Sequence, residues 1–243
     1  MKLDGKTVVV VGGGSGIGKA VAKMATATGA EVIISSRNAE TLDATVRELG
    51  AGTALPVDMT DPTSVEAWAE VLPKIDHLVI SASSAAHGHF VELPEADLRG
   101  MFGAKFFGPY AIAKACLPKL ATAASITFFS GVLSRRPGKN CSGLGAANGA
   151  VEALARALAL ELGPQIRVNC LSPGMVRSEA YARMPPDARA TMYEETGKSL
   201  PIGRVGEVEE AAEATLSLMS NSYTTGVVLD VDGGHMIRQY AHR

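Results

Sequence analysis

The stretch Val11-Gly12-Gly13-Gly14-Ser15-Gly16-Ile17-Gly18 follows a β-branched run, Thr7–Val11, and precedes a helical pattern. The glycines Gly12, Gly16 and Gly18 permit a tight turn and let the backbone approach a pyrophosphate without an intervening Cβ. The N–H groups that open the next helix would point at that anion. A merely flexible turn is the alternative interpretation, but the place of these glycines between the first strand and the first helix favours a dinucleotide-binding turn.

Strand-like and helix-like segments alternate along the whole chain. Runs typical of strands cover Thr7–Val11, Glu31–Ser35, Thr53–Val57, His77–Ser81, Ser125–Ser130, Ile166–Leu171 and Val227–Val231. Helical patterns cover Gly18–Thr28, Ala39–Leu49, Pro62–Val71, Leu98–Leu117, Gly145–Leu162 and Val208–Met219. Nearly continuous apolar strands separated by helices predict a parallel sheet covered on both faces. We therefore expect one α/β domain over residues 1–243, a doubly wound, Rossmann-like sheet with helices on both faces.

Residues 177–204 form the least regular part of the sequence and include Pro185, Pro186 and two tyrosines. In a compact domain, a long segment without a clear pattern is usually functional. We expect a lid or substrate loop there.

The composition excludes several classes of protein. Of the 243 residues, 47% are hydrophobic and 20% charged, which excludes a disordered chain. The formal net charge is −2 and aromatic residues are 5%, so nothing favours a nucleic-acid or anionic-membrane partner. Three cysteines are too few for a disulfide framework or a zinc site and indicate a reducing compartment. The N-terminus has no signal-peptide pattern, and we expect a cytoplasmic protein without a metal ion.

The end of the second predicted strand indicates which dinucleotide is bound. An NAD(H) site has an acidic residue about 20 residues after the glycines, where it bonds the ribose 2′-hydroxyl. This chain has Ser35-Ser36-Arg37 instead. A guanidinium pairs with a 2′-phosphate, which a carboxylate would repel. A solvated surface arginine is the alternative, but the pattern favours NADP(H).

Further motifs resemble the short-chain dehydrogenase/reductase family over essentially the whole chain. They are Asp58 in Val57-Asp58-Met59, the segment Arg167–Gly174, and Thr225-Gly226 followed by Asp230–Gly234. The resemblance implies that Asp58 contacts the adenine and that Val176 and Ser178 hold the nicotinamide carboxamide. Where the family has Asn-Asn-Ala-Gly, this chain has small residues, Ile80 to Ser83. The predicted cofactor-binding residues are Gly12, Ser15, Gly16, Ile17, Gly18, Ser36, Arg37, Asn38, Asp58, Met59, Ser81, Ala82, Ser83, Pro173, Gly174, Val176 and Ser178.

The resemblance breaks at the catalytic residues. The family uses a Tyr as general acid/base, a Lys four residues later that lowers the pKa of the phenol, a Ser that orients substrate, and an Asn in a proton relay. These positions hold Leu144, Asn148, Gly131 and Lys105 in this chain. Leucine cannot exchange a proton, so the usual mechanism is excluded.

The polar residues that remain suggest a different site. Lys105 stands at the family's Asn position and Asn148 at its Lys position. The chain therefore keeps one cation and one amide, but the two residue types have exchanged their positions in the sequence. The alternative is coincidence, with Lys105 solvated on a helix surface. Ser130 precedes the position of the missing serine and offers a hydroxyl to a substrate or to its own strand end. We name Lys105, Ser130 and Asn148 as candidate catalytic residues.

Other side chains in the sequence are also candidate proton donors for the reaction. His87 and His89 follow the fourth predicted strand, and histidine titrates near neutral pH, although loop histidines are more often simply exposed. Tyr181 and Tyr193 lie in the predicted lid and would bring a phenol on closure.

Two functions remain open. The first is an NADP-dependent oxidoreductase acting on a small carbonyl, imine or activated alkene without the usual Tyr and Lys. The second is a non-catalytic NADP(H)-binding sensor or structural oligomer. The −2 charge argues against a third, a DNA-binding regulator.

Self-association into a dimer or tetramer is a further expectation. The segments Leu98–Leu117 and Gly145–Leu162 are rich in apolar residues, and the second carries Glu152 and Arg156 as an i,i+4 pair. The resemblance implies a dimer face built from these two helices.

Overall fold

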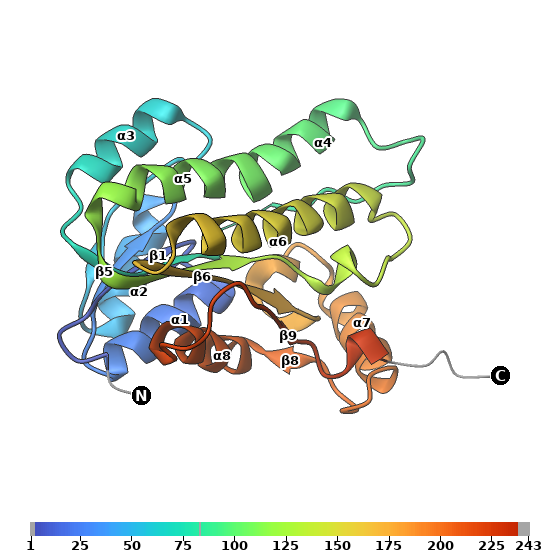
Figure 1. Ribbon diagram of the computed structural model, residues 1–243. Coiled ribbons are helices and arrows are strands. Elements are labelled where there is room, and N and C mark those ends of the chain that lie inside the picture. Colours follow the sequence, from blue (N-terminus) through green and yellow to red (C-terminus); the bar gives the residue numbers. More distant parts are fainter. Residues whose placement is uncertain (1–2, 83, 238–243) are drawn as a thin grey trace.

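The computed structural model describes residues 3–82 and 84–237 and shows a seven-stranded sheet in the order β3-β2-β1-β4-β5-β6-β9 (Figure 1). The strands are β1 (Thr7–Val11), β2 (Glu31–Ser35), β3 (Thr53–Ala54), β4 (Ile75–Ile80), β5 (Leu120–Phe129), β6 (Ile166–Pro173) and β9 (Val228–Val231). Every neighbouring pair in this sheet is parallel. The predicted doubly wound α/β fold is confirmed.

Helices cover both faces of the sheet (Figure 1). They are α1 (Gly16–Ala27), α2 (Ala39–Leu49), α3 (Pro62–Glu70), α4 (Glu95–Phe102), α5 (Gly108–Cys116), α6 (Ser142–Leu162), α7 (Pro186–Lys198) and α8 (Val208–Ser220). Side chains of a strand alternate between the faces, so Val8 and Val10 pack with α1, α2 and α8, whereas Val9 and Val11 pack with α3, α5 and α6. The two apolar cores hold the strand ends of the parallel sheet in fixed positions.

The predicted helix Leu98–Leu117 is interrupted. Between α4 and α5 the chain forms a π-helical turn, Gly103–Phe107. Pro109 explains the interruption, because proline has no N–H for the carbonyl of Lys105 and its ring would clash with that carbonyl in an α-helix. The wider turn carries Lys105 into the interior, and such turns are frequent at functional sites.

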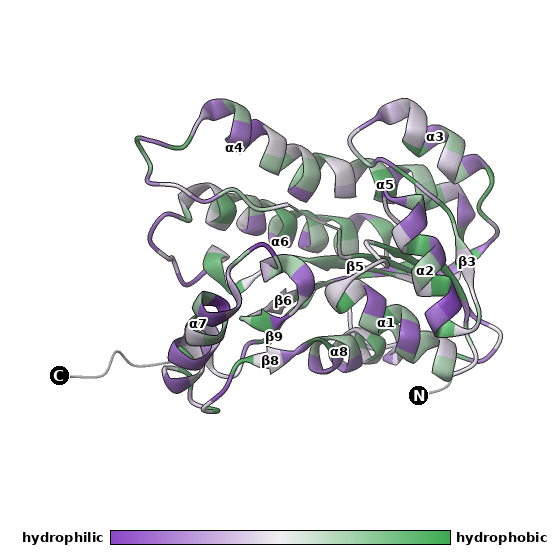
Figure 2. Ribbon diagram, turned by 180° about the vertical axis from the view of Figure 1, so that it is seen from behind, coloured by the Kyte–Doolittle hydropathy of each residue, from purple (hydrophilic) through white to green (hydrophobic). Residues whose placement is uncertain are grey.

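The predicted irregularity of residues 177–204 is wrong in part, because the segment contains α7. Pro186 occupies the first turn of that helix, where a missing N–H carries no penalty. Next to it, β7 (Val176–Arg177) pairs in parallel with β8 (Gly206–Glu207). The exposed α7 is mostly hydrophilic (Figure 2), so its sequence lacks the apolar periodicity that predicts a packed helix. A lid function for this segment stays a prediction.

No helix within residues 3–82 and 84–237 has the length and apolar character needed to cross a membrane.

Candidate functional site

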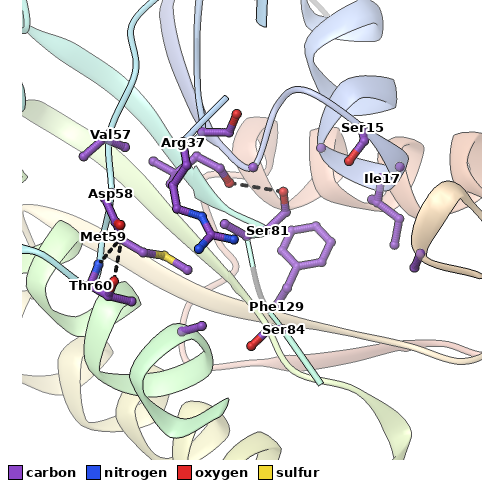
Figure 3. A pocket seen from close by; sticks show the side chains of 18 of the residues that line it. Ser15, Ile17, Arg37, Val57, Asp58, Met59, Thr60, Ser81, Ser84 and Phe129 are labelled. Atoms are coloured by element: carbon purple, nitrogen blue, oxygen red, sulfur yellow. Dashed lines mark hydrogen bonds between the residues drawn. The ribbon is translucent and has the colours of Figure 1, made fainter. Parts of the chain in front are cut away.

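A cleft of about 840 Å³ lies where β1, β2 and β4 end (Figure 3). Ligands of doubly wound sheets bind at this edge, outside the carboxyl ends of the strands. The cofactor residues predicted from sequence that line the cleft are Gly12, Ser15, Gly16, Ile17, Gly18, Ser36, Arg37, Asp58, Met59, Ser81, Ala82 and Ser178.

Two glycines of the first turn are fixed by close packing. Gly12 has a φ of +90°, and a Cβ there would lie 2.5 Å from the backbone nitrogen of Ala82. A Cβ on Gly18 would lie 2.2 Å from the carbonyl oxygen of Gly12. Any side chain at these positions would push the turn away from β4 and α1. The backbone therefore forms the close cradle that a pyrophosphate group requires.

The ribose end of the cleft carries a cation. Arg37 and Ser36 line it, and Arg37 extends across the opening (Figure 3). Asp58 lies nearby and accepts hydrogen bonds from the backbone nitrogen (2.9 Å) and the hydroxyl (2.7 Å) of Thr60. These two bonds, with a smaller contribution from the charge of Arg37, lower the pKa of Asp58. The ribose end thus presents a guanidinium at the point where an NAD(H) site would present a carboxylate.

Of the remaining predicted cofactor residues, the four that the structure describes lie outside the cleft lining. Asn38 caps α2, where its side chain accepts a hydrogen bond of 2.9 Å from the nitrogen of Thr41. Pro173 ends β6, and Gly174 packs against Asp232 so closely that a Cβ would lie 2.8 Å from its Cα. Val176 is buried. Ser83 lies outside the described residues.

Lys105 is buried, with 7% of its surface exposed. Its Nζ donates a 3.0 Å hydrogen bond to the carbonyl oxygen of Ser130, at the end of β5. Burial lowers the pKa of Lys105 from 10.5 to about 8, because the interior disfavours the charged form. The alternative of a solvated surface lysine is therefore wrong.

Asn148 approaches the same point from α6. It is 2% exposed, and its Nδ2 would lie 3.0 Å from a Cβ built on Gly131. Among the described residues its Oδ1 has no hydrogen-bond partner. A buried amide oxygen without a partner costs free energy, and such groups often mark functional sites. Lys105 and Asn148 thus both approach residues 130–131, from the π-helical turn and from α6.

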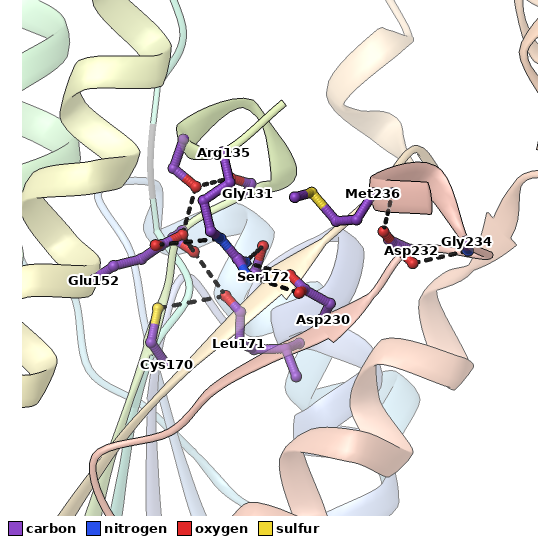
Figure 4. Close-up of polar contacts among 12 residues, drawn as sticks. Gly131, Arg135, Glu152, Cys170, Leu171, Ser172, Asp230, Asp232, Gly234 and Met236 are labelled. Atoms are coloured by element: carbon purple, nitrogen blue, oxygen red, sulfur yellow. Dashed lines mark hydrogen bonds and ion pairs between the residues drawn. The ribbon is translucent and has the colours of Figure 1, made fainter. Parts of the chain in front are cut away.

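Glu152 and Arg135 belong to a polar network that sequence reasoning missed (Figure 4), and Ser130 is part of it. Its hydroxyl donates to Glu152 Oε1 (3.1 Å), which also accepts from the hydroxyl of Ser134 (2.6 Å). Arg135 Nε lies 3.5 Å from Glu152 Oε2, and the same guanidinium pairs with both oxygens of Asp230. The predicted Glu152–Arg156 pair is wrong, because Glu152 is 4% exposed and contacts Ser130, Ser134 and Arg135, whereas Arg156 is exposed. The network fixes the Ser130 hydroxyl toward Glu152.

The alternative proton donors lie apart from the cleft lining. His87 Nδ1 is 3.4 Å from the sulfur of Cys141, at the start of α6. Tyr181 and Tyr193 pack edge to face with ring centroids 5.8 Å apart, and burial raises the pKa of Tyr181. The backbone carbonyl of His89 accepts from the nitrogens at positions 92 and 93.

Glu179 is a cleft residue that no motif indicated. Its Oε2 accepts a 2.9 Å hydrogen bond from the backbone nitrogen of Gly16, 163 residues earlier in the chain. Its place directly after Ser178, a predicted cofactor residue, is the only signal in the sequence. Other lining residues that the sequence reading missed include Thr60, Ser84, Phe129 and Ala180.

Comparisons with known proteins give a consistent result. A family profile described as Enoyl-(Acyl carrier protein) reductase matches residues 11–236. The galactitol 2-dehydrogenase (L-tagatose-forming) of Cereibacter sphaeroides is 36% identical over 249 residues, covering 97% of this chain and 97% of that one. The short-chain dehydrogenase/reductase ATR9 of Stachybotrys chlorohalonatus is 31% identical over 256 residues, covering 97% of this chain and 99% of that one.

A solved structure adds to these relatives. The crystal structure of a small-chain dehydrogenase in complex with NADPH superposes with a TM-score of 0.85 at 38% identity, covering 96% of this chain and 99% of that one. The fold, the glycine turn and these matches together show that the chain belongs to the short-chain dehydrogenase/reductase family.

Proposed function

We propose that the protein is an NADP(H)-dependent oxidoreductase that acts on a small carbonyl, imine or activated alkene through a non-standard active site. The observation that carries this proposal is the buried Lys105 ammonium beside Gly131, the position of the family's missing serine. Lys105 is a buried titratable cation next to Ala104, which lines the cleft that also carries Arg37.

The cleft residues, together with the neighbouring Val176, suit NADP(H) along its length. Backbone N–H groups of the turn from Gly12 to Gly18 bind the pyrophosphate, and Arg37 with Ser36 binds the 2′-phosphate. Asp58 and Met59 flank the adenine, and Ser178 with the Val176 backbone orients the carboxamide. When bound, the nicotinamide supplies or accepts the hydride, and the protein provides position and charge.

Lys105 supplies the proton and the positive charge in this proposal. With a pKa of about 8, it is mostly protonated at neutral pH yet able to give up a proton. Asn148 Oδ1, which has no partner among the described residues, accepts a hydrogen bond from substrate or an ordered water. Ser130 acts through its carbonyl, which holds the Lys105 ammonium in place.

The test is a turnover assay in which NADPH absorbance is followed with carbonyl, imine and activated-alkene compounds, and NADP⁺ reduction is followed with polyols. One relative is named as a galactitol dehydrogenase that forms L-tagatose, so ketoses and polyols enter the panel first. The variant Leu144→Tyr with Asn148→Lys rebuilds two of the family's groups and reports whether a substrate reaches the cofactor. Turnover by the unmodified protein supports the proposal, and turnover by the rebuilt variant alone contradicts it.

A specific observation favours the second candidate, a non-catalytic NADP(H)-binding protein. Lys105, Ser130 and Asn148 are all buried, and none of the three is among the residues that line the cleft. A sensor would bind NADPH and change its assembly or mobility without consuming it. Tight NADPH binding with no turnover over the whole panel would select this function.

We further propose that the chain forms a homo-oligomer through α5 and α6. Phe107 is 61% exposed directly before α5, Tyr110 is 45% exposed on α5, and Leu160 is 85% exposed on α6. Large exposed apolar side chains on neighbouring helices are typical of association surfaces. Analytical ultracentrifugation at micromolar concentration tests this proposal, and a species of monomer mass alone would contradict it.

A further inference from the structure

A carboxylate from the far end of the chain lies at the opening of α1. The Oε2 of Glu179 accepts a 2.9 Å hydrogen bond from the backbone nitrogen of Gly16, the first residue of that helix. Outside its own helix and chain neighbours, a Cβ built on Gly16 would come within 4 Å of two atoms in the described part of the chain, Ser178 Cβ (3.7 Å) and Glu179 Oε2 (3.8 Å). The segment around Ser178 is therefore what faces the start of α1.

The start of α1 lacks an anion of its own. The first N–H groups of a helix have no partners within it and carry partial positive charge. The cap residue Ser15 makes no side-chain hydrogen bond to the helix, and the first turn of α1 contains no acidic residue. Glu179 supplies the missing acceptor and the negative charge from 163 residues away.

Glu179 has no competing ionic partner among the described residues. Arg177, the nearest cation in sequence, pairs instead with Glu207 at 3.1 Å. The carboxylate can therefore leave Gly16 without breaking an ion pair. Glu179 and Ala180 also line the cleft next to the glycine turn.

We propose that the Glu179 carboxylate takes the position of the cofactor's pyrophosphate and must be displaced when the cofactor binds. This inference rests on the proposed function. Two anions at one helix start repel each other, and the Gly16 nitrogen has a single hydrogen to donate. Glu179 thus holds residues 178–181 against the cleft and weakens cofactor affinity until NADPH replaces it.

Isothermal titration of the full chain tests the proposal with Glu179→Gln and Glu179→Ala. The matched control is Glu195→Gln, which removes an exposed carboxylate of α7 whose ion pair with Lys198 is 3.9 Å long. We expect both Glu179 variants to bind NADPH about tenfold more tightly, as for the loss of one charge-assisted competitor. We expect the control to match the unmodified protein.

Titration with a second ligand, adenosine 2′-monophosphate, shows which part of the cofactor site Glu179 affects. Adenosine 2′-monophosphate carries the 2′-phosphate that Arg37 is proposed to bind but no pyrophosphate, so its affinity should be unchanged in every variant. Unchanged or weaker NADPH binding by both Glu179 variants would overturn the inference and leave the proposed function standing. An equal gain for adenosine 2′-monophosphate would also overturn it, because the effect would then not be located at the pyrophosphate. If no form of the protein bound NADPH, both the inference and the proposed function would fail.

Discussion

Lys105 Nζ lies 3.0 Å from the carbonyl oxygen of Ser130 and donates a hydrogen bond to it. This bond joins the π-helical turn between α4 and α5 to the end of β5. It places a cation beside Gly131, the position at which we expect the serine of the family's usual reaction. Lys105 is therefore the residue on which the proposed chemistry depends most.

Replacing Lys105 by Met should lower turnover by about 10²–10³, the usual cost of removing one preorganised charge from a reacting centre. Methionine keeps the length and apolar contacts of the side chain, so NADPH affinity should change little. Lys105→Arg should rescue poorly, because a guanidinium does not release a proton in this range. Steady-state rates and NADPH titrations of the three proteins check this prediction, and full activity in Lys105→Met would contradict a catalytic role.

The same residue predicts a pH dependence of stability. Burial lowers the pKa of Lys105 from 10.5 to about 8 in the folded protein, so between these pH values the unfolded chain binds more protons. Stability from this group therefore rises as pH increases through that window, and below it the full penalty of about 3 kcal/mol applies. Lys105→Met lacks the penalty, so its advantage in free energy of unfolding should shrink between pH 8 and 10. Urea denaturation of both proteins at several pH values measures the difference, which a constant gap would contradict.

The buried network around Glu152 predicts a structural effect. Glu152→Gln keeps the shape of the side chain but removes the charge that faces Arg135 and weakens an acceptor shared by the hydroxyls of Ser130 and Ser134. We expect a loss of about 1–3 kcal/mol in the free energy of unfolding. Glu161→Gln, at an exposed position of the same helix, should change it by less than about 0.5 kcal/mol. Equal effects of the two variants would contradict the role of the network.

Much of the fold follows from local sequence patterns. The strand Thr7–Val11, the helix Ala39–Leu49 and the glycine turn between β1 and α1 are specified by residues adjacent in sequence, and they lie where the pattern predicts. The cleft residues around Gly12 and Arg37 could be predicted for the same reason. They follow β1 and β2, which are neighbouring strands, so the strand pattern already places them at one edge of the sheet.

The rest depends on contacts between distant segments. The burial of Lys105 requires the π-helical turn that precedes Pro109 and the end of β5, 25 residues away. The helical pattern alone predicts that Glu152 lies on the exposed face of its helix. Its burial follows from its contacts with Arg135 and Ser134, which belong to another segment. The bond from Gly16 to Glu179 spans 163 residues, and no short motif encodes it.

The central claim is that this cleft binds NADP(H) and selects it through Arg37. Isothermal titration of the unmodified protein and of Arg37→Asp with NADPH and NADH tests it most directly. We expect the unmodified protein to bind NADPH at least about tenfold more tightly than NADH, because one charge-assisted guanidinium–phosphate contact is lost with NADH. We expect the reverse preference for Arg37→Asp, whose carboxylate repels the 2′-phosphate and accepts a hydrogen bond from the 2′-hydroxyl. Equal affinities in the unmodified protein, or an unchanged preference in the variant, would contradict the claim.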